Sequence, residues 1–302
     1  MAMRRAHVAL FASLALGVST LAACGSDSLE EGGGGSGQES GEQTEVEVDD
    51  EVAKLVPKDL EGATLNIGSD ASYAPNEFLG DDGKTVEGMD VDLFDAAAAK
   101  MGLETKWTNA PFDALILGVS SDKYDMAVSS FTINEERKKQ VSMISYFDAG
   151  TQWVVPKGNE GKIDPDDACG KSIGVQKGTV QIDDLDARSK QCEKDGKKPI
   201  KQVVDQEQSK VTASLISGKT EAMLADSPIA LYAVKQNDAE LESLGDIYDS
   251  APYGIVVPKE DTEFGEAIAA AFESMKEDGT YDEILEKWGN ESGGIDEFTV
   301  NP

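Results

Sequence analysis

Histidine, arginine and cysteine are scarce in this chain of 302 residues, and positive charge is scarce as a whole. The sequence holds 27 Lys+Arg against 58 Asp+Glu, which gives a formal net charge of −31. Nucleic acid is therefore excluded as a partner, because phosphate binding needs a basic face. Docking on an anionic lipid surface by charge alone is excluded for the same reason. The hydrophobic fraction of 39%, with 30 glycines besides, is that of a globular chain.

The single histidine, His7, lies in an N-terminal segment that we expect to be removed. The rest of the chain has no histidine, which excludes Ser-His-Asp and Cys-His catalysis and histidine-ligated metal sites. We therefore expect no catalytic residue, no metal ion and no cofactor. Outside that segment the only arginines are Arg137 and Arg188.

The N-terminal segment has the pattern of a secretory signal. Arg4 and Arg5 precede a short apolar run over residues 6–14, which is too short and too rich in alanine for a membrane span. The sequence Leu-Ala-Ala-Cys that ends at Cys24 resembles the lipobox of bacterial lipoproteins, in which the cysteine is lipidated. We expect a signal peptide over residues 1–23 and a lipid on Cys24. An ordinary signal with an incidental cysteine and a twin-arginine export signal are the alternatives.

Residues 24–52 are predicted to form a tether. They hold four consecutive glycines at 32–35 and many acidic residues, with no lysine or arginine. Such a composition cannot bury enough apolar surface to fold. A flexible chain of this length spans about 30 Å, from about 5–6 Å times the square root of the residue number. The tether would hold a folded body at the outer face of the cell membrane.

Beyond residue 52, strand and helix patterns alternate, which predicts an α/β fold with a parallel sheet. Strands are predicted at residues 63–68, 104–108, 125–129, 172–175, 200–204 and 221–224. Helices are predicted at residues 90–101, 112–119, 134–141, 180–188, 210–216, 228–235, 263–276 and 281–288. Outside the cytoplasm the even pair Cys169 and Cys192 predicts a disulfide, and two free thiols are the alternative.

Two internal similarities predict two lobes. The sequence Val-Val-Pro-Lys occurs at residues 154–157 and again at 256–259, and the strand–helix alternation restarts between the copies. We expect a second lobe, residues 155–258, inserted into a first lobe of residues 53–154 and 259–302. The two copies would be the strands that cross between the lobes. Both lobes also contain a helix, a turn, an acidic residue and a buried strand in the same order.

Polar side chains follow the predicted strands, where ligands of open α/β sheets bind. Lobe 1 offers hydroxyls at Ser129, Ser130 and Thr132 and the guanidinium of Arg137, a group that can hold both oxygens of a carboxylate. Lobe 2 offers the backbone of Gly178 and Thr179 at a helix start, and the carboxylate of Asp226. A free α-amino acid has charges that match this arrangement. The aromatic side chains of Tyr73 and Phe112 could wall the cleft and exclude water.

Each of these features also has a purely structural interpretation. The serines could form a surface turn, and Arg137 lies in a charged run that could be a solvated face. Asp226 and the Gly178–Thr179 turn could cap the helices that follow them. Tyr73 and Phe112 could belong to the core.

Several motifs together resemble one protein family. They are Tyr-Ala-Pro-Asn-Glu-Phe at residues 73–78, Gly-Met-Asp-Val-Asp-Leu at 88–93, Lys-Tyr-Asp at 123–125 with Thr132 and Arg137 after it, Gly-Thr at 178–179, Gly-Thr-Tyr at 279–281 and Lys-Trp-Gly at 287–289. On these motifs, residues 62–290 resemble the family 3 solute-binding proteins of bacterial ABC transporters, the polar amino-acid binders. The resemblance implies a two-lobed, type II periplasmic-binding-protein-like fold with two crossing strands as a hinge.

The resemblance also implies roles for the site residues. Arg137 would bind the ligand carboxylate, Asp226 its ammonium group, and Ser130 and Thr132 would add hydrogen bonds. The side chains of Tyr73 and Phe112 would pack on the ligand side chain. Three positions depart from the family pattern, because Asn76 replaces an aromatic residue, Asn134 replaces threonine and Val180 replaces a second hydroxyl. The first two affect side-chain specificity, and the third removes one hydrogen bond.

The sequence therefore predicts a monomeric, lipid-anchored receptor that delivers an amino acid to an ABC permease. Asp70 could reach a cationic or amide side chain, or could cap its own loop, so we expect a polar or basic ligand. A dehydratase on the same fold is one alternative, with Glu77 as its candidate general acid. A lipoprotein that presents its ligand to a partner sensor is another.

Overall fold

The computed structural model describes residues 46–302. The expected signal peptide, the lipidation site at Cys24 and most of the expected tether lie outside the described residues. The first element is the short helix α1 (Asp50–Ala53), which the side chain of Asp49 caps. Val52 in this helix is buried. The last residues of the segment expected to be a tether are therefore packed on the folded body.

One eight-stranded sheet runs through the described chain, in the order β5-β1-β6-β11-β7-β10-β8-β9. Its strands are β1 (Thr64–Ser69), β5 (Glu104–Asn109), β6 (Met126–Thr132), β7 (Val141–Pro156), β8 (Ser172–Gln176), β9 (Lys201–Asp205), β10 (Ala222–Asp226) and β11 (Leu241–Pro258). Strands β5, β1 and β6 pair in parallel at one end, and β10, β8 and β9 pair in parallel at the other. The predicted α/β class is confirmed, and the sheet consists of two parallel units joined by antiparallel strands.

Lobe 1 is built on β5, β1 and β6. Its other elements are the helices α2 (Met89–Lys100), α3 (Phe112–Ser120), α7 (Thr262–Asp278) and α8 (Thr280–Trp288), the short 3-10 helices η1 (Arg137–Lys139) and η2 (Glu291–Gly293), and a small sheet of β2 (Ser72–Tyr73), β3 (Glu77–Leu79) and β4 (Val86–Glu87). The apolar side chains of Leu93, Phe94 and Ala97 in α2 are buried, as is Met101 directly after it. Among residues 46–302, no helix combines the length and apolar character that crossing a membrane requires.

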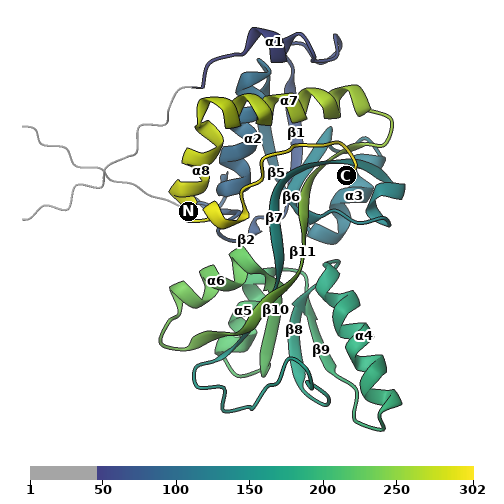
Figure 1. Cartoon of the computed structure of the whole chain (residues 1–302), viewed down its shortest axis with the longest axis vertical. Coiled ribbons are helices and arrows are strands. Elements are labelled where there is room, and N and C mark those ends of the chain that lie inside the picture. Colours follow the sequence, from purple (N-terminus) through teal and green to yellow (C-terminus); the bar gives the residue numbers. More distant parts are fainter. Residues whose placement is uncertain (1–45) are drawn as a thin grey trace, which may run out of the picture. The chain divides into compact units, whose positions relative to one another are not determined.

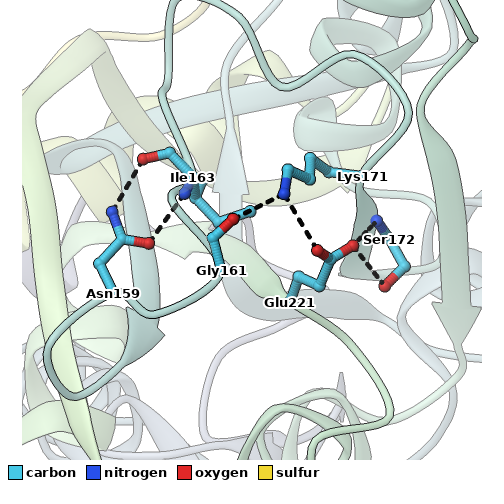
Figure 2. A network of polar contacts seen from close by, with 6 residues as sticks. All are labelled: Asn159, Gly161, Ile163, Lys171, Ser172 and Glu221. Carbon is cyan, nitrogen blue, oxygen red and sulfur yellow. Dashed lines mark hydrogen bonds and ion pairs between the residues drawn. The ribbon is translucent and has the colours of Figure 1, made fainter.

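Lobe 2 is built on β10, β8 and β9, with the helices α4 (Val180–Lys194), α5 (Gln208–Ile216) and α6 (Ser227–Gln236). The predicted disulfide is present, and it joins Cys169 in the loop before β8 to Cys192 in α4, with 5.6 Å between the Cα atoms. Figure 2 shows how the same loop is held near its other end. Lys171 Nζ donates to Gly161 O at 2.6 Å and pairs with Glu221 Oε1 at 3.2 Å.

Strands β7 and β11 connect the two groups of helices (Figure 1). In lobe 1, residues 141–147 of β7 pair with residues 253–258 of β11, and in lobe 2, residues 151–154 of β7 pair with β10. The register of the β7–β11 ladder shifts near Tyr248 and Ala251. We therefore propose lobe boundaries near residues 148–151 and 248–252, several residues from the expected ones at 154/155 and 258/259.

The second internal similarity corresponds to a repeated arrangement of hydrogen bonds. In lobe 1, Asp125 accepts from the backbone N–H of Asn66 at 2.7 Å with its carboxylate, just before β6. In lobe 2, Glu221 accepts from the backbone N–H of Ser172 at 2.9 Å, just before β10. Each carboxylate thus accepts from a backbone N–H group near the start of the neighbouring parallel strand. Ser130 follows Asp125 by the same number of residues as Asp226 follows Glu221. Ser130 and Asp226 therefore occupy equivalent positions near the ends of β6 and β10.

The helix predicted at residues 134–141 is wrong. Strand β6 runs on to Thr132, only the single turn η1 follows, and β7 begins at Val141. The side chain of Asn134 holds the start of this turn, because its Oδ1 accepts from Arg137 N at 2.9 Å. The turn ends early because the β-branched and apolar residues from Val141 to Ile144 pair with β11 and are buried.

Candidate ligand-binding site

A small cavity lies between the two lobes. It is lined by Tyr73, Phe112, Ser130, Thr132, Arg137, Gln176, Thr179, Val180, Gln181 and Asp226. Seven of the ten residues that the sequence assigned to ligand binding are in this lining. The other three, Asp70, Ser129 and Gly178, are adjacent to it through hydrogen bonds described below.

Arg137 is held by η1 with its side chain in the cavity wall, and it is 8% exposed. Its two terminal nitrogens donate to backbone carbonyls on either side of the cleft, to Thr132 O at 2.7 Å and to Gly178 O at 3.1 Å. The guanidinium also lies over the rings of Phe112 and Phe131, at 5.4 and 5.6 Å from their centroids. Arg137 is in none of the ion pairs formed within residues 46–302.

The guanidinium of Arg137 is therefore buried, oriented by carbonyl groups and free of any carboxylate contact among the described residues. Burial lowers its pKa from the ordinary value, but that value is so high that the group stays charged. A buried cation held in this way attracts an anion strongly, because little water screens it. The interpretation of Arg137 as part of a solvated charged face is wrong.

Asp226 ends β10 in lobe 2 and is 6% exposed. Its carboxylate accepts hydrogen bonds from the hydroxyl groups of Tyr73 and Tyr253, both at 2.9 Å, and from Gln181 Nε2 at 2.7 Å. Asp226 is the N-cap residue of α6, but its side chain makes no capping hydrogen bond to the backbone of that helix. Burial raises the pKa of Asp226, and the three donors oppose that change. An oriented, buried carboxylate of this kind suits an ammonium group.

The paired serines have different positions. Ser130 lines the cavity and adopts a left-handed backbone conformation with φ +52°. Ser129 points into lobe 1, where its hydroxyl donates to Glu77 Oε1 at 2.9 Å and accepts from Asp70 N at 3.0 Å. The structure thus places Ser130 at the site and Ser129 behind it.

Asp70 lies at the end of β1 and is 4% exposed. Its carboxylate accepts from the backbone N–H groups of Ser72 at 3.1 Å and Phe112 at 2.8 Å, and from Gln176 Nε2 of lobe 2 at 3.1 Å. Burial raises its pKa. Asp70 therefore holds the start of α3 and also contacts the other lobe, next to the cavity.

The Gly178–Thr179 turn brings the start of α4 to the cavity. Gly178 has φ +83°, and its carbonyl accepts from Arg137. Thr179 donates its hydroxyl to Gln176 O at 2.8 Å, and no side chain caps α4. The N-terminus of this 15-residue helix therefore faces the cleft next to Arg137, which adds positive potential for an anion.

Gln176 and Gln181 line the cavity but were not predicted from the sequence. Gln176 is the last residue of β8, so the rule that polar residues at strand ends form the site could have identified it. Its Oε1 atom is buried and has no hydrogen-bond partner within residues 46–302. Gln181 lies in the first turn of α4, and no sequence signal distinguishes it from a surface residue.

The aromatic residues Tyr73 and Phe112 belong to the hydrophobic core and also line the cavity. Phe112 stacks on Phe131 with 4.8 Å between the ring centroids, and it also lines the cavity. Glu77, the candidate general acid, is fully buried in lobe 1 and is not part of the cavity lining. The candidate acid of the dehydratase alternative therefore does not face the cleft.

Comparison with known proteins gives concordant results. Residues 65–291 match the family model of the bacterial extracellular solute-binding proteins, family 3. The arginine-binding protein ArgT of Corynebacterium glutamicum is 36% identical over 253 residues, which cover 83% of each chain. The L-cystine-binding protein TcyJ of Escherichia coli is 30% identical over 243 residues, 78% of this chain and 85% of TcyJ.

Solved structures agree with these relatives. An ancestral arginine-binding protein bound to arginine superimposes with a TM-score of 0.70 at 37% identity, over 76% of this chain and 99% of the other. The ancestral amino acid-binding protein AncCDT-1, a precursor of cyclohexadienyl dehydratase, gives a TM-score of 0.64 at 30% identity, over 74% and 95% of the two chains. The similarity thus extends over both lobes, including the cleft.

Proposed function

Because the chain belongs to the bacterial extracellular solute-binding proteins, family 3, we propose that it captures a free amino acid between its lobes and delivers it to an ABC permease. The protein is a binding protein, not an enzyme, in keeping with its family and its relatives. Ligand binding favours the closed arrangement of the two lobes, which the permease then recognises.

One observation carries this proposal. Arg137 of lobe 1 and Asp226 of lobe 2 are two buried, oppositely charged groups in the wall of one cavity. An α-amino acid has a carboxylate and an ammonium group on one carbon, so it satisfies both groups at once. A ligand with only one of these charges would leave a buried charge without a partner, which costs several kcal/mol.

We propose L-arginine as the ligand. ArgT and the ancestral protein both carry names that specify arginine. In this chain, the carboxylate of Asp70 and the unpartnered Oε1 of Gln176 are hydrogen-bond acceptors beside the cavity. A guanidinium group supplies several donors in one plane and suits such acceptors.

The lipid anchor belongs to the same proposal. A signal peptide over residues 1–23, a lipid on Cys24 and a tether would keep the receptor at the outer face of the membrane, near the permease. The support is the sequence pattern before Cys24. Incorporation of labelled palmitate in cells, compared with a Cys24→Ala variant, tests the anchor separately.

Calorimetric titration of the purified protein tests the ligand, after partial unfolding and dialysis to strip any amino acid carried through purification. We expect L-arginine to bind most tightly. Citrulline keeps the shape of arginine without the side-chain charge and should bind more weakly. Agmatine lacks the α-carboxylate and should not bind. Absence of binding by every common free amino acid would refute the proposed function, and tighter binding of an uncharged amino acid would refute the choice of arginine.

A further inference from the structure

Two carboxyl groups lie in the interior of lobe 1 directly behind Ser130. Glu77 comes from β3 and Asp90 from the first turn of α2, and both residues are fully buried. The hydroxyl of Ser130 lies within reach of both side chains. Neither residue lines the ligand cavity, so neither belongs to the binding site described above.

The two carboxyl groups have different surroundings. Asp90 Oδ2 accepts from Tyr146 Oη at 2.6 Å, from the backbone N–H of Ser130 at 2.9 Å and from Ser130 Oγ at 3.1 Å. Glu77 accepts from Ser129 Oγ at 2.9 Å, and its other oxygen is 3.4 Å from Ser130 Oγ. Asp90 Oδ1 has no donor among the described residues when both groups are taken as carboxylates.

No positive charge balances this pair. None of the ion pairs within residues 46–302 includes Glu77 or Asp90. The titratable groups that face the pair from neighbouring elements are Tyr146 on β7, Tyr73 on β2 and Asp70 after β1. These groups are neutral or negative. Two adjacent buried carboxyl groups with no cation beside them among the described residues do not both ionise at neutral pH, since burial and like charge each disfavour the second charge.

We infer that Glu77 keeps its proton at neutral pH and donates a hydrogen bond to the ionised carboxylate of Asp90, and that Asp90 thereby fixes Ser130 in its left-handed conformation at the cavity wall. Both are positioning residues, because they act on the ligand only through Ser130. The effect on ligand binding rests on the proposed function, but the location of the proton does not.

The donors decide which group holds the proton. Three bonds from Tyr146 and Ser130 stabilise the ionised form of Asp90, whereas Glu77 has one short bond, from Ser129. A proton on Glu77 would also add a donor beside Asp90, whose Oδ1 has no partner among the described residues. In agreement, burial and the neighbouring charge of Asp90 hold the pKa of Glu77 well above the ordinary range.

Infrared difference spectroscopy of the ligand-free protein tests the location of the proton. A protonated carboxyl group has a C=O stretching band that carboxylates lack. At neutral pH the wild-type protein should show this band, Glu77→Gln should lose it, and Glu61→Gln, a change at an exposed residue of the same lobe, should keep it. If wild type and Glu77→Gln show no difference in this region, the inference is overturned.

Arginine titrations over a pH series test the positioning role. The side-chain amide that Glu77→Gln introduces cannot ionise, whereas Glu77 itself loses its proton at alkaline pH and then repels Asp90. The ratio of the wild-type Kd to the Kd of Glu77→Gln should therefore lie within about threefold at neutral pH and rise at least about tenfold towards alkaline pH, which corresponds to about 1.4 kcal/mol. A constant ratio would overturn the positioning role. Failure of both proteins to bind any amino acid would refute the proposed function instead, and the infrared result would still stand.

Discussion

Gly178 in lobe 2 lies against Asp113 in lobe 1 across the mouth of the cleft. A Cβ atom on Gly178 would lie 2.9 Å from Cβ and 3.2 Å from Cα of Asp113. The same region contains an ion pair between Lys177 Nζ and Asp113 Oδ2 at 2.9 Å, and the bond from Arg137 to the carbonyl of Gly178. The lobes therefore approach to van der Waals contact here, and they do so because residue 178 has no side chain.

We predict that Gly178→Ala weakens arginine binding about 10- to 100-fold, because overpacking costs about 1–3 kcal/mol. The methyl group meets backbone-linked atoms of Asp113 only when the lobes are closed. An open form has no such clash, so the substitution acts on closure and not on the contacts of one lobe. Calorimetric titration of the variant with arginine measures the effect.

Gly196→Ala is the matched control. Gly196 also lies in lobe 2 with φ +71°, but a Cβ atom there has no neighbour within 4 Å. Both variants strain a left-handed residue, which should lower their melting temperatures similarly. Only Gly178→Ala should lose affinity. Equal losses of affinity in the two variants would show that backbone strain, and not contact between the lobes, is responsible.

We predict that Arg137→Ala abolishes measurable binding and that Arg137→Lys weakens it at least about 100-fold. Removing one partner of a buried charge pair costs about 3–5 kcal/mol. Lysine keeps the charge, but it cannot donate in one plane to Thr132 O, Gly178 O and a ligand carboxylate together. Titration with arginine measures both losses.

Arg188→Ala is the control for the arginine substitutions. Arg188 lies in α4 of lobe 2, where it pairs with Asp184 at 2.8 Å and lies over the rings of Trp153 and Tyr248. Its loss should lower the melting temperature and leave the Kd for arginine unchanged. Wild-type affinity in Arg137→Ala would refute the role of Arg137 as the carboxylate-binding group.

The fold could be predicted from the sequence because its signals are local. The βα alternation depends on spacing alone, and the structure confirms it. The helix predicted at residues 134–141 was wrong because two influences oppose each other there. The side chain of Asn134 favours a helical turn locally, but Val141 pairs with β11, a strand distant in sequence, and this pairing decides the outcome. The lobe boundaries depend in the same way on how β7 and β11 pair.

The site could be predicted only in part. Residues at strand ends, such as Asp226, follow from topology, because parallel strands end at one edge of a sheet. The difference between Ser129 and Ser130 does not follow from topology, because it depends on the left-handed backbone at Ser130 and on the buried Glu77 and Asp90 behind it. Sequence spacing alone does not indicate which of the two serines lines the cavity.

We predict that Asp70→Asn weakens arginine binding about 10- to 100-fold, since a hydrogen bond to a charged group contributes about 1.5–3 kcal/mol. The amide keeps the shape of the side chain and one acceptor but loses the charge. Citrulline should bind the variant and the wild type about equally. Asp95→Asn, at an exposed position of α2, should change neither affinity. Parallel losses for arginine and citrulline would show that Asp70 acts on the structure of the cleft and not on the ligand charge.

We predict that replacing both Cys169 and Cys192 by serine lowers the free energy of unfolding by about 3 kcal/mol, the chain-entropy value for a loop of this length. The disulfide fastens the loop before β8 to α4, and neither cysteine lines the cavity. Arginine affinity at room temperature should therefore be unchanged. Urea unfolding measures the first quantity and titration the second. An unchanged unfolding midpoint would contradict the prediction, as would a loss of affinity in the folded variant.

The pH dependence of binding should follow the pKa of Asp226, which burial raises. The ligand ammonium group needs the ionised carboxylate, so arginine affinity should fall, by up to about tenfold per pH unit, as the pH drops below that pKa. Stability of the free protein should change in the opposite direction. A raised folded-state pKa contributes stability at low pH that is lost as the pH rises through the folded-state value.

Titrations in two buffers of different ionisation enthalpy should show that a proton is released on binding at mildly acidic pH. The loss of arginine affinity at acidic pH should persist in Asp70→Asn, in which Asp226 still lines the cavity. A pH-independent Kd in that variant would refute the assignment to Asp226.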